Sequence, residues 1–159
     1  MTRKHALLAF LLLLVAGLPV GAAYTTMVVP MEERSTATFY IDVILPDVGN
    51  MSLMVDTGAA YMTINEDMLK TMEKKGHAVF VRELSARLAD GSVRDYPVYK
   101  VSEINIGGKC VIQNVEVAVL PGNTRCMLGL SALRKAAPFE FSMDPPQLRL
   151  SNCDTVSSS

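Results

Sequence analysis

The chain has 159 residues and a formal net charge of −1 at pH 7, a length that fits one domain and a charge that leaves no basic stripe. Only 6% of its residues are aromatic and none is Trp, so neither nucleic acid nor stacked bases are expected as partners. It contains no Cys-x-x-Cys spacing and only two histidines, so we expect no metal and no other cofactor.

Residues 1–23 are predicted to be a signal peptide. Arg3 and Lys4 give it a positive start, residues 6–20 are apolar, and small residues near its end suit a signal peptidase. The alternative is an uncleaved membrane anchor over residues 6–29, because no further charge occurs before Glu32. In either case we expect the rest of the chain to be exported, as a periplasmic or secreted protein that meets a membrane only if this segment is retained.

Two strands that form a hairpin are predicted next. Apolar and polar residues alternate over residues 38–45, which is typical of a strand with one buried face. Turn-forming residues occupy 46–50, and residues 51–55 resume the alternation and lead directly into Asp56. Residues 65–76 then predict a short helix, with an asparagine cap at its start and a glycine at its end.

The remaining chain is predicted to be mostly β-strand. Residues 79–88 and 93–101 flank Ala89-Asp90-Gly91-Ser92, in which Asp-Gly is a strong hairpin signal. Further strand-like segments lie at residues 104–106, 111–119, 126–129, 139–143 and 148–150, and residues 131–137 predict a second short helix. Many short strands at close spacing predict an all-β barrel or sandwich in one domain over residues 24–151, followed by a disordered polar tail over 152–159.

The three cysteines are an odd number, which in an exported protein leaves one thiol free or shared between chains. We expect Cys110 and Cys126 to form the internal disulfide, because both adjoin strand-like segments. Cys153 lies in the polar tail, where it would be free to reach a partner.

Asp56 stands at the end of an apolar strand, although burial penalises a charged carboxylate. Thr57 follows with a hydroxyl group, and Gly58 permits a sharp turn and a close backbone approach. Two carboxylates held close together cannot both ionise, so one can act as an acid and the other as a base. The chain contains a single Asp-Thr-Gly, so the second carboxylate would have to come from a second copy related by a two-fold axis.

Residues 53–59, LMVDTGA, resemble the active-site strand and loop of the retropepsin-like aspartic proteases, the single-lobed dimeric relatives of pepsin. The hairpin at residues 89–92 falls where that family has its flap. Residues 104–120 resemble strands of the exported bacterial members. Residues 126–129, CMLG, resemble the apolar-apolar-glycine strand that packs beneath the family's catalytic loop.

This resemblance, which spans about residues 36–151, implies a homodimeric closed β-barrel with one or two short helices that hydrolyses peptide bonds without a metal. Its implied catalytic residues are Asp56, which would share a water with its twin, Thr57, which would brace its counterpart across the axis, and Gly58. Ala59 and the flap residues Ala89, Asp90, Gly91 and Ser92 would contact a peptide substrate, and Leu128 and Gly129 would support the loop.

Two other hypotheses stay open from the sequence. One is a non-catalytic exported module that has the same fold and captures peptides. The other is a structural dimer joined through Cys153, with Asp-Thr-Gly as an ordinary turn. A serine or cysteine hydrolase is disfavoured because His77, expected to be a solvated loop residue, stands alone among lysines.

Overall fold

The structure is a computed structural model that describes residues 25–35, 37–88 and 90–154. Outside the described residues lie the predicted signal peptide over residues 1–23, all of the alternative anchor except residues 25–29, residue Ala89 of the candidate flap, and residues 155–159 of the expected tail. Within the described ranges, no helix has the length and apolar character that crossing a membrane would require.

The described residues form eleven strands and two short helices, which confirms the predicted all-β class. In chain order they are β1 (Met27–Pro30), β2 (Glu32–Arg34), β3 (Thr38–Leu45), β4 (Gly49–Val55), β5 (Met62–Asn65), α1 (Glu66–Glu73), β6 (Ala78–Arg87), β7 (Val93–Ile106), β8 (Cys110–Leu120), β9 (Met127–Leu128), α2 (Leu130–Leu133), β10 (Phe139–Met143) and β11 (Pro146–Leu150).

Eight strands form one sheet in the order β2-β3-β4-β9-β5-β8-β7-β6, and an additional pairing of β3 with β7 closes this sheet into a barrel. At the closure Val43 lies opposite Ile106. Aliphatic side chains such as Leu53, Ile64 and Leu128 are fully buried and fill the interior. Because β4 and β9 lie within the closed part, the residues that follow them leave the barrel from fixed positions.

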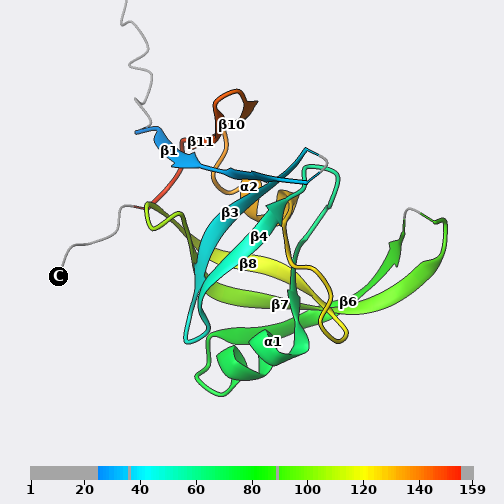
Figure 1. The fold of residues 1–159 in the computed structure, drawn as a ribbon. Coiled ribbons are helices and arrows are strands. Elements are labelled where there is room, and N and C mark those ends of the chain that lie inside the picture. Colours follow the sequence, from blue (N-terminus) through cyan, green and yellow to red (C-terminus); the bar gives the residue numbers. More distant parts are fainter. Residues whose placement is uncertain (1–24, 36, 89, 155–159) are drawn as a thin grey trace, which may run out of the picture.

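The two ends of the described chain form a separate antiparallel sheet in the order β1-β11-β10, which we call the terminal sheet. An edge-to-face contact between Phe39 and Phe141, with ring centroids 5.3 Å apart, joins this sheet to the barrel. Gly107 allows β1 to approach closely, since a Cβ atom there would lie 2.1 Å from Cγ1 of Val29. Figure 1 shows the terminal sheet at the end of the barrel toward which β4 points.

Most predicted elements are present, although several differ in their bounds and strands β1, β2 and β5 were not predicted. The side chain of Asn65 caps α1 by accepting a hydrogen bond from the amide of Met68 at 2.9 Å. The predicted strands at 93–101 and 104–106 are one continuous strand, β7, because its pairing with β8 runs through both segments. The second helix is also shorter than residues 131–137, since α2 ends at Leu133 and turns follow it.

The expected Cys110–Cys126 disulfide is wrong, because Cys110 bonds to Cys153. The chain after β11 returns to the start of β8, where Asp154 and Val111 exchange two backbone hydrogen bonds. The beginning of the expected disordered tail is therefore attached to the barrel. The sequence did not indicate this, because the contact joins residues that are far apart along the chain. Cys126 is the free cysteine, and burial raises the pKa of its thiol.

Removing this disulfide is expected to lower the free energy of unfolding by about 2–4 kcal/mol, because the bond closes a long loop in the unfolded chain. The sequence separation of Cys110 and Cys153 is 43 residues. Denaturant titrations of Cys110→Ser/Cys153→Ser and of the parent protein measure the difference. Alkylation of the unfolded, unreduced protein should label Cys126 alone, and labelling of Cys110 or Cys153 would contradict the assignment.

Candidate active site

Strand β4 holds Asp56 at a fixed exit from the barrel. It pairs with β3 on one side and runs parallel to β9 on the other, with Val55 opposite Leu128. The amide of Asp56 donates a hydrogen bond to the carbonyl oxygen of Leu128 at 3.1 Å. The backbone of Asp56 is therefore anchored to β9, while its side chain is half-buried at the end of the strand.

The Asp-Thr-Gly turn orients its own carboxylate. The amide of Gly58 donates to Oδ1 of Asp56 at 2.8 Å, and the amide of Ala59 donates to the carbonyl oxygen of Asp56 at 3.3 Å. A Cβ atom at position 58 would lie only 3.2 Å from Oδ1, so glycine keeps this approach open. Thr57 and Gly58 are exposed, so the turn presents one oriented carboxylate at the surface.

Gly129 lets the loop over residues 56–61 rest directly on the start of α2. A Cβ atom at Gly129 would lie 2.2 Å from the carbonyl oxygen of Tyr61 and 2.9 Å from that of Ala59. The next amide, that of Leu130, donates to the carbonyl oxygen of Ala59 at 2.9 Å. The structure thus brings Leu128 and Gly129 into contact with the Asp56 loop.

Two hydroxyl groups that sequence reasoning missed fix strand β5, which follows the loop, to its neighbours. Thr63 is a buried polar residue, and its Oγ1 accepts a hydrogen bond from the amide of Met127 at 2.9 Å. Ser131 accepts from the amide of Met62 at 2.8 Å and donates to the carbonyl oxygen of Glu116 at 2.6 Å. The sequence indicated these roles only weakly, because each is a single hydroxyl residue between apolar neighbours.

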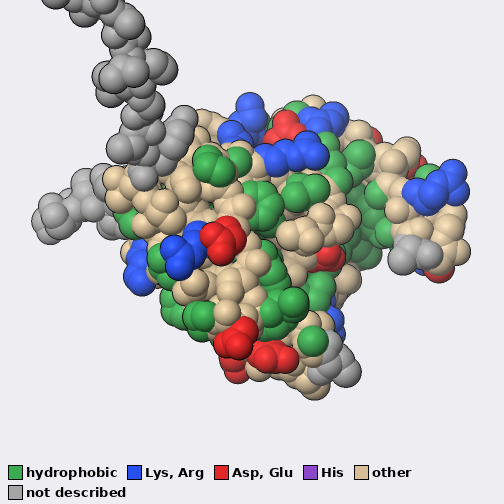
Figure 2. All heavy atoms as spheres, turned by 90° about the horizontal axis from the view of Figure 1, so that it is seen from above, with side chains coloured by type: hydrophobic (Ala, Val, Ile, Leu, Met, Phe, Trp, Pro, Cys, Tyr) green, Lys and Arg blue, Asp and Glu red, His purple; other side chains and the backbone are tan. Residues whose placement is uncertain are grey.

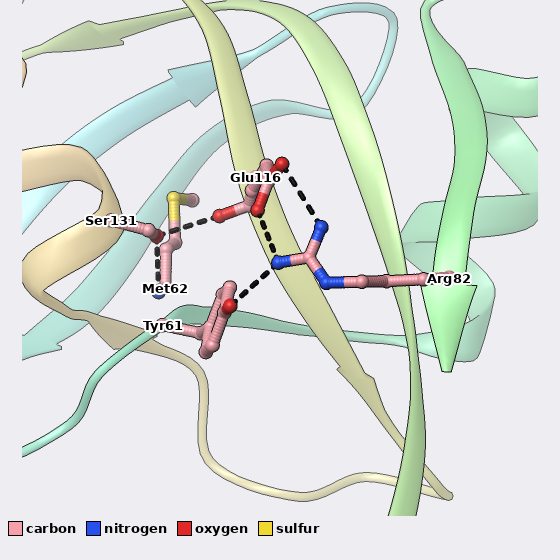
Figure 3. A network of polar contacts seen from close by, with 5 residues as sticks. All are labelled: Tyr61, Met62, Arg82, Glu116 and Ser131. Atoms are coloured by element: carbon pink, nitrogen blue, oxygen red, sulfur yellow. Dashed lines mark hydrogen bonds and ion pairs between the residues drawn. The ribbon is translucent and has the colours of Figure 1, made fainter. Parts of the chain in front are cut away.

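An ion-paired network connects this loop to β6 (Figure 3). The Arg82 side chain reaches Glu116 with two hydrogen bonds of 2.7 and 3.2 Å, and it donates a third to the Tyr61 hydroxyl at 2.7 Å. These hydrogen bonds hold the pKa of Glu116 below its ordinary value, although partial burial opposes the change. Arg82 therefore ties β6 to β8 and to the loop that carries Asp56.

The candidate flap is the β6–β7 hairpin, which extends away from the barrel in Figure 1. At its tip, the amide and the hydroxyl of Ser92 both donate to Oδ1 of Asp90, and these bonds lower the pKa of Asp90. Gly91 adopts a positive φ of 84° at the turn. Within the described part of the hairpin, Asp90, Gly91 and Ser92 have no hydrogen bond to the Asp56 loop, so the structure does not bring the tip and the loop together.

His77 lies in the connection between α1 and β6 with its side chain 40% exposed, as expected of a solvated loop residue, but two polar contacts also hold it. Its Nε2 lies 3.1 Å from Oδ2 of Asp47, and its Nδ1 lies 3.1 Å from Oγ of Ser102. These contacts join the β3–β4 turn to the segments after α1 and within β7, at the end of the barrel that carries α1 (Figure 1). His77 therefore links elements that are distant in sequence, which gives it a structural role.

The fold and the Asp56 loop define the class of single-lobed retropepsin-like aspartic proteases. Among solved structures, a retropepsin-like aspartic protease from Rickettsia conorii is similar, with a TM-score of 0.55 and 17% sequence identity over 82% of this chain and 98% of that chain. No match was found among curated proteins.

The family model described as "gag-polyprotein putative aspartyl protease" matches residues 41–135, more than half of the chain. The chain belongs to this family.

Gly129→Ala is expected to lower the free energy of unfolding by about 3 kcal/mol, because the added methyl group meets rigid backbone. Gly108→Ala is the matched control. Gly108 has a positive φ of 68° but open space around it, so that variant should lose only about 1 kcal/mol. Denaturant titrations measure both losses, and an equal loss in the two variants would contradict the role given to the close approach at Gly129.

The Arg82–Glu116 pair should stabilise the fold at neutral pH and cease to do so in acid. The folded-state pKa of Glu116 is depressed, so this stabilisation is present above the ordinary value of 4.5 and is lost as the pH falls through the lower folded value. A double-mutant cycle with Arg82→Met and Glu116→Gln at pH 7 and pH 3 measures the coupling. A coupling that is unchanged at pH 3 would show that charge does not cause it.

Proposed function

We propose that this protein is an aspartic endopeptidase in which two copies of Asp56, one from each subunit of a homodimer, hold one catalytic water. The observation that carries the proposal is the Asp56 turn, in which a carboxylate anchored by β9 and oriented by the Gly58 amide reaches the surface. A single carboxylate is half of an acid–base pair. A two-fold axis beside the turn would supply the other half.

In this mechanism one Asp56 carboxylate is ionised and its partner is protonated. The ionised group accepts a proton from the water as the water oxygen attacks the carbonyl carbon of the scissile peptide bond. The protonated group donates its proton to the carbonyl oxygen, and the resulting tetrahedral species collapses with protonation of the leaving amine. Thr57 would support its counterpart across the axis, and Gly58 and Ala59 would offer backbone groups to an extended peptide covered by the β6–β7 hairpin.

The terminal sheet is the surface that we assign to the dimer contact. Residues 27–30 and 147–150 pair with each other within one chain, which leaves β1 and β10 as the edges of this sheet. Val28 and Met143 are exposed hydrophobic residues on these two strands. Figure 2 looks onto this end of the molecule, where hydrophobic side chains lie among charged ones. Sheet edges of this kind readily pair with a second chain.

Export is part of the proposal and rests on the amino-terminal sequence. The positive start and the apolar segment over residues 6–20 are typical of a signal peptide, and a periplasmic or extracellular location also suits the Cys110–Cys153 disulfide. Fractionation of cells that express the full chain, with sequencing of the mature amino terminus, tests both the location and the cleavage.

Asp56→Asn is expected to reduce peptide cleavage by at least about 100-fold while preserving the shape of the side chain, because the variant lacks the acid–base pair. The test incubates the purified protein with a diverse peptide mixture from pH 3 to 8 and detects products by mass spectrometry. The parent rate should pass through a maximum, since neither the doubly protonated nor the doubly ionised pair is active. Cleavage by both proteins would contradict the role of Asp56, and peptide binding without cleavage would favour a capture module.

A mixing experiment tests whether the site is shared. Adding an equal amount of the Asp56→Asn protein to the parent protein, with time for subunits to exchange, should leave about half of the parent activity, because random pairing places half of the parent subunits in mixed dimers. A monomeric enzyme would keep its full activity. Asp67→Asn, at an exposed position of α1, serves as a matched charge control for the exchange step, since a mixed dimer with that variant retains both Asp56 carboxylates.

A further inference from the structure

A polar hollow of about 480 Å³ lies directly beside the loop that carries Asp56. Its lining includes Ala60 and Tyr61 from that loop, Glu116 from β8, and the three basic residues Lys100, Arg134 and Lys135. The proposed reaction gives these basic residues no role.

Among the described residues, the three basic side chains of the hollow form no ion pair of their own, and its one carboxylate, Glu116, is bound to Arg82. Both oxygens of Glu116 accept hydrogen bonds from Arg82, so the charge of Glu116 is already matched by a residue outside the lining. Figure 3 shows this side chain turned toward Arg82. In the described ranges, none of the ion pairs includes Lys100, Arg134 or Lys135.

The positive charges of the basic residues are directed at the same hollow. Lys100 and Lys135 each lie close enough to Glu116 to contribute, after Arg82, to the lowering of its pKa. Lys100 is on β7, whereas Lys135 follows α2, so two separate elements direct positive charge toward the hollow. An anion that entered it would meet cations from both sides, which favours binding more than a single surface lysine would.

The position of the hollow indicates what kind of anion reaches it. Ala60 and Tyr61 lie two and three residues after Gly58 of the Asp-Thr-Gly turn. The Tyr61 hydroxyl accepts a hydrogen bond from Arg82 on the first strand of the candidate flap. A peptide that lay along the Asp56 loop in an extended conformation would send alternate side chains to one side of its path. A residue of the same peptide, several positions from the scissile bond, is therefore the natural occupant.

We propose that this hollow is a subsite for an acidic side chain, Asp or Glu, of the peptide substrate, and that it makes the protein selective for acidic peptides. Inorganic phosphate offers similar anionic oxygens, but the continuity of the hollow with the catalytic loop favours the side-chain carboxylate. The inference deepens the proposed function and rests on it for the cleavage step, whereas binding of an acidic peptide does not require cleavage.

The binding test uses the Asp56→Asn protein, which should hold peptides without cutting them. The probes are a fluorescein-labelled peptide of four Gly-Ser-Glu repeats, its Gly-Ser-Gln counterpart, and inorganic phosphate. Adding Arg134→Gln/Lys135→Gln should weaken binding of the Glu peptide about fivefold at low salt, in keeping with the modest strength of exposed ion pairs. The difference should shrink as the salt concentration rises.

Lys74→Gln/Lys75→Gln is the matched control, since it removes the same charge from the exposed end of α1 and should leave the affinity for the Glu peptide unchanged. Lys100→Gln approaches the hollow from β7 and provides an independent variant if the double substitution impairs folding, which circular dichroism monitors. Equal loss in the control, equal affinity for the Glu and Gln peptides, or binding of phosphate without binding of the Glu peptide would overturn the proposal.

The cleavage test compares the products that the parent and the Arg134→Gln/Lys135→Gln proteins release from the same peptide mixture. Products of the parent should be enriched in Asp or Glu at a fixed distance from the cut bond, and the variant should lose this enrichment. Cleavage without any acidic preference overturns the subsite but leaves the protease. Selective binding of the Glu peptide with no cleavage at any pH supports the subsite and overturns the protease.

Discussion

The loop that carries Asp56 depends on one close backbone contact, in which Gly129 lies against the carbonyl groups of Ala59 and Tyr61. Any side chain at this position would push the loop off the start of α2, because the nearest neighbours are backbone atoms that cannot rotate away. The contact also sets the hydrogen bond between the Leu130 amide and the Ala59 carbonyl group. With the Asp56 amide bound to Leu128, the loop is fixed from the barrel side, and only its outward-facing groups remain for chemistry.

Two hydroxyl groups, one of them buried, complete this support because β4, β9 and β5 share few regular ladder hydrogen bonds where they meet. Strand β9 has only two residues, so the amide of Met127 finds its acceptor in the Thr63 side chain. Ser131 performs the same task for the amide of Met62 and connects it to β8. An alanine at either position would leave a partly buried amide without its side-chain partner, a more severe loss than that of an exposed hydrogen bond.

The parts of the fold that local patterns encode were predictable, and those that depend on distant contacts were not. The alternation in β3, the Asn65 cap of α1 and the Asp-Thr-Gly turn each involve neighbouring residues, and each has the expected form. The Cys110–Cys153 bond depends on where the chain passes after β11, and the Arg82 network depends on the alignment of β6 with β8. The spacing of residues along the sequence indicates neither contact. The Cys110–Cys126 pairing was inferred from local patterns alone and was wrong.

Two-fold symmetry would give the proposed homodimer two copies of the acidic subsite. In the proposed homodimer, the axis that duplicates Asp56 also duplicates the hollow formed with Arg134 and Lys135. A bound peptide has a direction and therefore cannot obey that symmetry, so it would meet one hollow on the amino side of the scissile bond and the other on the carboxyl side. The two hollows are chemically identical, but they face opposite halves of the peptide. Selectivity for acidic residues should then appear on both sides of the cut bond, and it should be strongest for peptides that present an acidic residue to each hollow.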